Sequence, residues 1–369
     1  MKQKILRFGW LIIVVMVLAF APKTVQAQPT VTPEKPSSGD GSESNPYQIA
    51  SKENLYWFAN EVNSGNVSIC AELTTHIKVN DNVLNEDGSL KSPIPTEELI
   101  QWIPIGNKNN KFQGTFDGHG NTISGLYCYG ENDYVGLFGC IYDYKNIPAI
   151  RNVGVIDSYI KGNDFVGGVC GQNFGGIIEN CYNTGKVSGN WYIGGVCGYN
   201  MKHTIKNCYN AGFVSGTEVG GVCGRNGYGC IIDNCYNTGV VSGTNNNVYV
   251  GGVCGENYYG TITNSYNTGQ VSGFGINGAY IGGVCGESGG IVTNCYNIGE
   301  IGYDENNANV GGVCGYKFGG TITNCYYLND ENKSQYPGIG KPSSDEKGIT
   351  EGKSADEFAN GSVAWLLNG

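Results

Sequence analysis

Apolar residues between about positions 131 and 330 occur in short runs separated by glycine and asparagine, and this pattern repeats. The string V/I-G-G-V-C-G occurs six times at steps of 26–31 residues, preceded by a variant, V-G-L-F-G. The strings begin at Val135, Val166, Ile193, Val219, Val250, Ile281 and Val310. In most blocks a segment I-x-N-C-Y-N-x-G and a short V-S-G segment follow. Each block therefore contains three short β-prone runs with turns between them.

The period of this repeat predicts the architecture. A block of about 29 residues with three turns cannot enclose a core of its own, whereas stacked blocks share one continuous core. Helical repeats of similar period need apolar residues at spacings of three and four, and a Gly-Gly pair in nearly every block opposes a helix. We therefore expect an all-β fold, a right-handed parallel β-helix (β-solenoid). Seven coils at ~4.8 Å each would form a rod section ~34 Å long.

The flanks of the repeats are expected to cover the ends of this rod, because an uncovered end exposes unpaired strand edges. Ser51 is placed to N-cap a helix that runs to about Gly65. Near the C-terminus, Ser354 and Glu357 have the spacing of a capping box. We therefore predict short helical caps at both ends. The apolar residues expected to cover the last coil are Phe358, Val363, Trp365, Leu366 and Leu367.

The start of the chain has the pattern of a secretory signal peptide, with basic residues, an apolar run and the small residues Val25 and Ala27. The apolar run is too short to span a bilayer, so we expect a secreted or cell-surface protein with no membrane span in the mature chain. The predicted segments are a signal peptide (1–27), a linker (28–45), an N-terminal cap helix with the first coils (46–130), the repeats (131–330) and a C-terminal cap (331–369).

The composition excludes several classes of protein. Of the 369 residues 60 are glycine, 40% are hydrophobic and only 15% are charged. The apolar content is too high for a disordered chain, and no Gly-X-Y period indicates collagen. The formal net charge is −10 and no basic cluster occurs, so the surface would repel phosphate backbones. We expect a monomer that does not bind nucleic acid.

The repeat resembles the GLUG-motif repeat of secreted and surface proteins of bacteria. The strict motif is present as Gly136-Leu137-Phe138-Gly139, whereas later blocks place a cysteine where its final glycine falls. The resemblance covers about residues 46–330. In that family the repeats accompany adhesin-like surface proteins and IgA-cleaving metallopeptidases. The resemblance therefore implies a location and a shape more than a chemistry.

Stacked coils would place equivalent residues above one another, so that each column forms a ladder. Asparagine side chains in one such column can bond amide to amide along the axis, which predicts a structural ladder. Its members are Asn152, Asn180, Asn207, Asn234, Asn264, Asn294 and Asn324.

Cysteine forms two further columns, and the chain has 15 cysteines in all. A secreted protein invites disulfides, but Ser265 interrupts the second column, and a small, weakly polar filler also suits tight glycine turns. Free buried thiols and several disulfides both remain open. A metal site is not expected, because no C-x-x-C pair occurs.

Aromatic residues also recur in register. Tyr182 and its equivalents follow the second cysteine column. Another set precedes the V/I of the repeated string and is interrupted by Glu218 and Asn309. A row of rings can either pack on itself or stack on sugars. The residues that we expect to contact a glycan are Tyr134, Phe165, Tyr192, Tyr249 and Tyr280.

No motif for catalysis is present. The three histidines do not form H-E-x-x-H, and neither G-x-S-x-G nor a phosphate-binding loop occurs. Asp117 and His119 have the residue types of a general acid–base pair, but also those of a turn. We therefore expect a protein without a cofactor and without enzymatic activity. Its expected partner is a neutral glycan or a host or surface protein.

Two other functions stay open. One is a carbohydrate-active β-helix enzyme, a lyase or a hydrolase, and the other is a spacer in a surface assembly. Two or three carboxylates together with an arginine or lysine in one groove would favour the enzyme.

Overall fold

The protein is described from a computed structural model. The model describes residues 29–91, 98–142, 147–273, 278–303, 308–329, 336–341 and 349–368. The predicted signal peptide lies outside the described residues.

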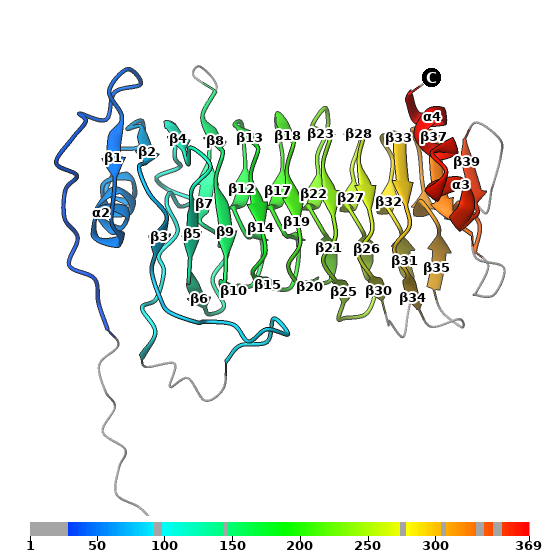
Figure 1. Cartoon of the computed structure of the whole chain (residues 1–369), viewed down its shortest axis with the longest axis horizontal. Coiled ribbons are helices and arrows are strands. Elements are labelled where there is room, and N and C mark those ends of the chain that lie inside the picture. Colours follow the sequence, from blue (N-terminus) through cyan, green and yellow to red (C-terminus); the bar gives the residue numbers. More distant parts are fainter. Residues whose placement is uncertain are drawn as a thin grey trace, which may run out of the picture.

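The described chain forms a rod of stacked coils in which every pair of neighbouring strands named below runs parallel (Figure 1). Equivalent positions of successive blocks pair directly, as Cys170 does with Cys197 and Tyr182 with Tyr209. The prediction of an all-β parallel β-helix is therefore confirmed.

One coil contains five short strands rather than the three predicted runs. The coil that starts at Val166 holds β11 (Val166–Gly167), β12 (Cys170–Asn173), β13 (Ile177–Glu179), β14 (Tyr182–Asn183) and β15 (Lys186–Ser188). The Gly-Gly pair separates the first two strands. Asn180, with a left-handed φ of 53°, separates β13 from β14. In the last coils one strand continues through the equivalent asparagine, as in Ile291–Asn297 and Thr321–Leu328.

The strands build four sheets. The glycine-pair sheet contains β11, β16 (Ile193–Gly194), β21 (Glu218–Gly220), β26 (Tyr249–Gly251), β31 (Ala279–Gly282) and β35 (Ala308–Gly311). The cysteine sheet contains β7 (Phe138–Ile141), β12, β17 (Cys197–Asn200), β22 (Cys223–Asn226), β27 (Cys254–Asn257), β32 (Cys285–Ser288), β36 (Cys314–Lys317) and β38 (Ile339–Lys341). The serine sheet contains β6 (Tyr127–Tyr129), β10 (Tyr159–Lys161), β15, β20 (Val214–Gly216), β25 (Val241–Gly243), β30 (Val271–Gly273) and β34 (Ile301–Tyr303).

The fourth, large sheet covers the face turned to the viewer in Figure 1. Its N-terminal strands are β1 (Tyr47–Ile49), β2 (Ala71–Leu73), β3 (Ile77–Lys78), β4 (Thr115–Asp117), β5 (Thr122–Ser124), β8 (Ala149–Arg151) and β9 (Gly154–Ile156). Its repeat strands are β13, β14, β18 (Thr204–Lys206), β19 (Tyr209–Asn210), β23 (Ile231–Asp233), β24 (Tyr236–Asn237), β28 (Thr261–Thr263), β29 (Tyr266–Asn267), β33 (Ile291–Asn297), β37 (Thr321–Leu328) and β39 (Thr350–Lys353).

The core is a set of columns inside the coil. In the coil of β11 four side chains are fully buried, those of Val166, Val169, Ile178 and Val187. Equivalent buried residues in the other coils extend each of them into a column along the rod. Burial of an aliphatic side chain contributes about 1.5–3 kcal/mol, so each coil gains stability chiefly by stacking on its neighbours.

All fifteen cysteines lie in the described part of the chain, and each is a buried free thiol in the structure. In the second column the thiol of Cys208 lies 3.1 Å from the carbonyl oxygen of Lys206 and donates to it. The cysteines thus fill the corners of the coil as small side chains with a weak donor.

We expect thiol reagents to distinguish the folded from the unfolded chain. In native buffer the thiols should react slowly because they are buried, and in non-reducing denaturant most of the fifteen should be labelled. Intact mass after alkylation with iodoacetamide measures the number directly. Twelve or more unreactive cysteines in denaturant would instead establish disulfides.

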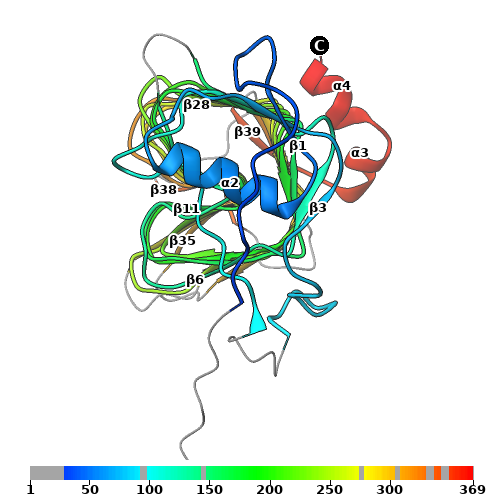
Figure 2. The same ribbon diagram turned by 90° about the vertical axis from the view of Figure 1, so that its left-hand side faces the viewer.

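The N-terminal cap is a helix, α2 (Lys52–Asn63), that lies across the end of the coil in the end-on view of Figure 2. The hydroxyl of Ser51 accepts a hydrogen bond from the backbone N–H of Asn54 at 3.2 Å, as its N-cap position predicts. Leu55 and Phe58 are fully buried against the first coils. Residues 29–45, predicted as a linker, run along this cap, where Cys70 donates its backbone N–H to the carbonyl of Gly41.

The C-terminal cap differs from the prediction. Ser354 and Glu357 form the expected capping box, but two short helices follow, α3 (Ala355–Ala359) and α4 (Ser362–Asn368). Figure 2 shows both helices beside the outline of the coil rather than across its end. Phe358 packs on the outer ring of Tyr296, whereas the side chain of Trp365 is 70% exposed. The expectation that Trp365 covers the last coil is wrong.

Candidate functional site

The predicted asparagine ladder forms an outer corner of the rod. All seven members have positive φ angles of 51–56°. The Nδ2 atom of Asn180 donates to Oδ1 of Asn152 at 2.9 Å, and Asn324 donates to Asn294 at 2.7 Å. Asn264 instead donates to the carboxylate of Asp233 at 2.8 Å, so the ladder of hydrogen bonds between side-chain amides is not continuous. These bonds hold the corner together, which supports the structural role.

Two further ladders lie inside the coil and were missed from the sequence. One consists of Asn183, Asn210, Asn237, Asn267 and Asn297, the other of Asn173, Asn200, Asn226 and Asn257, and all nine side chains are at most 1% exposed. Each of the first four amides of the first set donates to the next asparagine at 2.7–2.8 Å. The repetition of Y-N-x-G and of C-G-x-N was the available signal. Since buried amides need partners, these ladders are structural.

The aromatic residues predicted to contact a glycan do form a row, but their ring faces cover one another. The rings of Tyr134 and Phe165 are stacked at 4.9 Å with planes 7° apart, and Phe165 stacks on Tyr192 at 4.9 Å. Tyr249 and Tyr280 form a second stack at 5.6 Å. Inside each stack only the edges of the rings are therefore available to a ligand. The row of exposed ring faces that a glycan would stack on is absent from the described residues.

The first three residues of this row have an unusual backbone conformation. Tyr134, Phe165 and Tyr192 have φ angles of 58–62°, in the left-handed region that bulky residues rarely adopt. Such a conformation costs on the order of 1–2 kcal/mol per residue, and conformations of this kind cluster at functional sites.

A second column of side chains, from the cysteine sheet, interlocks with the row. Tyr199 stacks on Tyr192 at 5.3 Å, and Tyr316 stacks on Tyr280 at 4.7 Å. We call these two columns together the seam. Its second column contains Cys140, Gln172, Tyr199, Arg225, Glu256, Glu287, Tyr316 and Lys341, which are in register on neighbouring coils.

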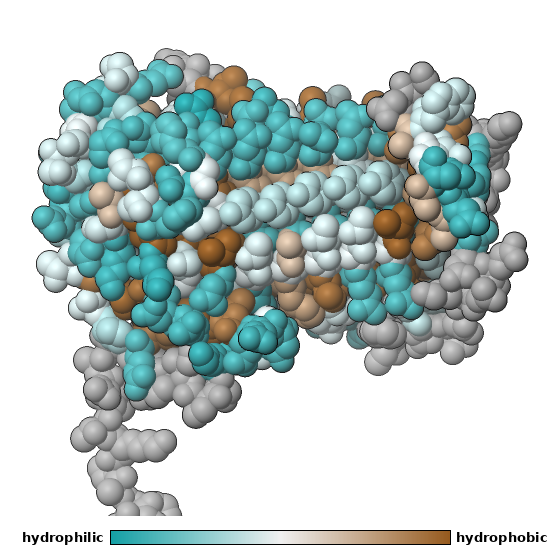
Figure 3. Space-filling model, viewed as in Figure 1, coloured by the Kyte–Doolittle hydropathy of each residue, from teal (hydrophilic) through white to brown (hydrophobic). Residues whose placement is uncertain are grey.

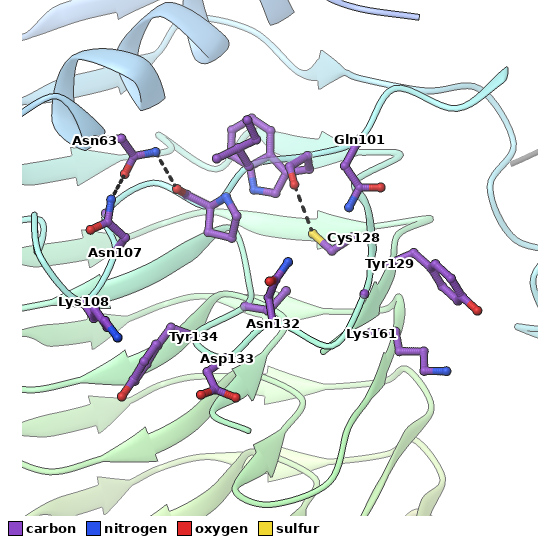
Figure 4. A pocket seen from close by; sticks show the side chains of 16 residues that line it. Asn63, Gln101, Asn107, Lys108, Cys128, Tyr129, Asn132, Asp133, Tyr134 and Lys161 are labelled. Carbon is purple, nitrogen blue, oxygen red and sulfur yellow. Dashed lines mark hydrogen bonds between the residues drawn. The ribbon is translucent and has the colours of Figure 1, made fainter. Parts of the chain in front are cut away.

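At its N-terminal end the seam opens into a pocket of about 380 Å³ (Figure 4). Tyr134, the terminal ring of the row, is part of the pocket wall. Because Phe165 covers one face of this ring, that face is not available to a ligand. Tyr129, 52% exposed, lines the same pocket, with the ammonium group of Lys161 5.1 Å from its ring centre.

Amide groups supply most of the other polar atoms of this pocket. Asn63, the last residue of α2, donates to the carbonyl of Pro104 at 3.0 Å and accepts from Nδ2 of Asn107 at 3.2 Å. The cap helix therefore fixes the loop that forms one wall. The remaining polar side chains of the lining are Gln101, Lys108, Asn132, Asp133 and Lys161. Sequence reasoning found Tyr134 but not this lining, which four separate segments of the chain supply.

A group of charged residues occupies the centre of the seam. Glu218 stands where the row would have its fourth ring, and it is only 2% exposed. The guanidinium group of Arg225 lies 5.6 Å from the ring centre of Tyr192, and its Nε atom is 3.2 Å from a carboxylate oxygen of Glu256. That Nε contact is an ion pair without the alignment of a hydrogen bond. Glu287 follows Glu256 on the next coil.

The carboxyl groups of this cluster resist ionisation. Burial, together with the charge of Glu256, raises the pKa of Glu218 well above its usual range. Burial also raises the pKa of Glu256, although Arg225 opposes this shift. Burial and the neighbouring Glu256 raise the pKa of Glu287 to about 7. Three carboxyl groups thus lie near one guanidinium, and their raised pKa values favour the protonated, neutral form.

Asp117 and His119 lie in one turn, where the backbone N–H of His119 donates to Oδ1 of Asp117 at 2.9 Å and the ring Nδ1 lies 4.0 Å from the same oxygen. Asp117 accepts from Nε of Arg151 at 2.7 Å and from Nδ2 of Asn152 at 2.9 Å, so it begins the outer ladder. The ring of His119 instead contacts Glu72, with 2.9 Å between Nε2 and Oε2. The hydrogen bond to Glu72 raises the pKa of His119. These contacts support the alternative of a turn.

The opposite face of the rod carries the other aromatic set. Tyr182, Tyr209 and Tyr236 stack at 4.8 Å with planes at most 4° apart. Figure 3 shows this face as mainly hydrophilic, with a pale band over β14 and β19. These rings also cover one another, so this face offers edges and hydroxyl groups.

Two further properties limit the chemistry. No group of three or more His, Cys, Asp and Glu side chains in the described ranges is arranged to hold a metal ion. No helix among the described residues is both long and apolar enough to cross a membrane.

Comparison with known protein families finds the repeat that was predicted from the sequence. A family model described as the GLUG motif matches residues 166–188, 189–214, 215–242 and 246–272. These four coils are GLUG-motif repeats. The matches end before the last coils, which carry the same V/I-G-G-V-C-G string.

The chain is also similar to two individual proteins. A crystal structure from Bacteroides ovatus, described as a "putative immunoglobulin A1 protease", superposes with a TM-score of 0.54 at 20% identity, covering 89% of this chain and 90% of the other. This likeness establishes the fold alone. A "Putative Gly-rich membrane protein" of Evansella cellulosilytica is 34% identical over 83 residues, which are 21% of this chain. The chain spans 9% of that relative's length.

Proposed function

We propose that this GLUG-repeat protein acts outside the cell, at a surface, and binds a neutral glycan in the pocket beside Tyr134. The observation that carries the proposal is the end of the aromatic row, where a half-buried ring meets a pocket lined by amides. A sugar needs an apolar surface for its ring together with donors and acceptors for its hydroxyl groups. The signal peptide predicted from the sequence supports the location, and the GLUG repeats agree with it.

Binding rather than catalysis fits the pocket. Its lining contains one carboxylate, that of Asp133, whereas glycoside hydrolysis ordinarily needs two carboxyl groups on either side of the bond. The two lysines and the amides orient a ligand without supplying an acid and a base. We therefore infer that the protein holds its glycan intact.

Binding of neutral oligosaccharides by the mature chain tests this proposal. We expect the substitution Tyr134→Asn to weaken binding about tenfold, because loss of one stacked ring removes ~1.5 kcal/mol. Asparagine is chosen because it tolerates the left-handed backbone at this position. A glycan array identifies the ligand, and isothermal titration calorimetry measures the change.

The matched control is Tyr236→Ala, which removes an equally stacked ring from the opposite face of the rod. It should bind like the unchanged protein. Equal binding by Tyr134→Asn and the unchanged protein would exclude the pocket, and absence of binding to every glycan tested would contradict the proposed function.

A further inference from the structure

The pocket beside Tyr134 has an apolar interior. Three members of its lining, Trp102, Cys128 and Val135, are at most 5% exposed and form its inner wall. The indole Nε1 atom of Trp102 already donates to the carbonyl of Gly136 at 3.1 Å, and the thiol of Cys128 donates to the carbonyl of Trp102 at 3.9 Å. These buried side chains therefore offer no free hydrogen-bond donor to a ligand.

A sugar hydroxyl group is poorly suited to this interior. A hydroxyl group that leaves water without finding a new partner loses its hydrogen bonds, which opposes binding. A methyl group has no hydrogen bonds to lose, and its own burial favours binding. The innermost part of the ligand is therefore expected to be a small apolar substituent.

The mouth of the pocket combines amides with apolar surface. Gln101 and Asn132 belong to the lining, and no hydrogen bond joins either side-chain amide to another described residue (Figure 4). Ile103 and Tyr129, 55% and 52% exposed, lie in the same lining. A free amide has both a donor and an acceptor, so it matches a ligand group that also has both.

We propose that the sugar in this pocket carries an N-acetyl group, so that the ligand is a glycan of N-acetylated hexosamines. The methyl group would enter the interior against Cys128 and Val135, while the amide N–H and carbonyl face Gln101 and Asn132 at the mouth. Such a sugar is neutral, as the proposed function requires. The inference rests on that function and deepens it, because it names the class of sugar at the same site.

The charges of the lining favour the acetylated sugar over one with a free amine. Lys108 and Lys161 line the pocket and form no ion pair with a described residue, so they would repel a protonated amine. The carboxylate of Asp133 accepts hydrogen bonds from Nδ2 of Asn163 at 2.9 Å and from the backbone N–H of Asp164 at 3.2 Å. Its charge is therefore already engaged by the next coil.

The experiment compares triacetylchitotriose with cellotriose by isothermal titration calorimetry of the mature chain. The two trimers have the same length and the same β-1,4 linkage, and they differ in the acetamido or hydroxyl group at C2. We expect the acetylated trimer to bind at least about tenfold more tightly, through burial of a methyl group and two added hydrogen bonds. A trimer with N-formyl groups keeps the amide but lacks the methyl group, and it should lose about threefold or more of this preference.

Two substitutions test the contacts. Val135→Thr places a hydroxyl group on the inner wall with little change in volume, and it should lower the preference to about threefold or less. Val250→Thr makes the same change in the same column, away from the pocket, and should keep the full preference. Asn132→Ala alters an exposed residue, so it tests the amide contact without burdening folding, and it too should lower the preference to about threefold or less. Circular dichroism of each variant checks that the coils are intact.

The outcomes separate the two proposals. Equal binding of the two trimers overturns the inference, and the proposed function stands if Tyr134→Asn weakens both. Binding of the formylated trimer as tightly as the acetylated one, or a loss of preference in Val250→Thr as large as in Val135→Thr, also overturns the inference. If neither trimer binds and a glycan array is negative as well, the proposed function fails and the inference fails with it.

Discussion

Replacing the buried amide of Asn210 with alanine is expected to destabilise the rod by about 3–5 kcal/mol. The side chain donates to the carbonyl of Gly212 at 2.9 Å and to Asn237 at 2.8 Å. It accepts from Asn183 at 2.8 Å and from the backbone N–H of Gly212 at 3.3 Å. The substitution removes all four hydrogen bonds and leaves a cavity against Gly195, whose backbone lies against this side chain. Urea unfolding followed by far-ultraviolet circular dichroism measures the loss.

Two variants of the same coil show where the effect originates. Asn210→Asp keeps the shape but removes both N–H donors and places a charge in the core, so it should be at least as damaging as alanine. Asn207→Gly lies three residues earlier on the exposed corner, at a φ of 53° that glycine adopts freely, and should cost less than about 1 kcal/mol. Similar losses for Asn207→Gly and Asn210→Ala would contradict the difference between the outer and inner ladders.

The second large effect is expected at Gly224. A Cβ atom there would lie 2.4 Å from the backbone nitrogen of Ile193 and 2.7 Å from the carbonyl oxygen of Gly198. Backbone atoms cannot move aside as a flexible side chain can, so Gly224→Ala should cost more than about 4 kcal/mol or prevent this coil from forming. The same urea titration reports the midpoint, and limited proteolysis reports local opening.

Gly319→Ala is the control for this prediction. The atom nearest to its added Cβ would be 3.5 Å away, which is ordinary contact, and the position is not in the left-handed region. This variant should change stability by less than about 1 kcal/mol, and a gain is expected if the unfolded chain loses freedom. A tolerated Gly224→Ala would mean that the two sheets do not approach as closely as the structure shows.

Sequence reasoning was most successful where each coil depends only on its neighbours. The recurrence of V/I-G-G-V-C-G at 26–31 residues was sufficient to predict stacked coils, their register and a buried column such as that of Val166. The helix that begins after Ser51 was predicted from its N-cap and its apolar spacing. These features follow from local patterns, because stacking repeats one set of contacts along the axis.

The inner details of a coil were harder to predict. Three runs per block were expected, whereas the coil of β11 has five strands, because the Gly-Gly pair and the left-handed Asn180 each divide what looked like one run. The same repeat contains three asparagine columns, and only the outer one was recognised. Which amide points inward depends on the direction of the backbone at each corner, and composition does not contain that information.

The candidate sites depended most on the tertiary structure. From the sequence, Glu218 was an interruption of an aromatic row, and the structure makes it part of a charged cluster with Arg225 and Glu256. Those residues meet because two strands of a coil turn back on each other at the Gly-Gly pair, while stacking brings successive coils together. The pocket beside Tyr134 needs the cap helix and two loops that do not repeat. The sequence by itself therefore determined the rod and its period, through contacts between adjacent equivalent coils. The tertiary structure alone decided which side chains meet at the seam and at its end, because those contacts join segments that no repeat relates.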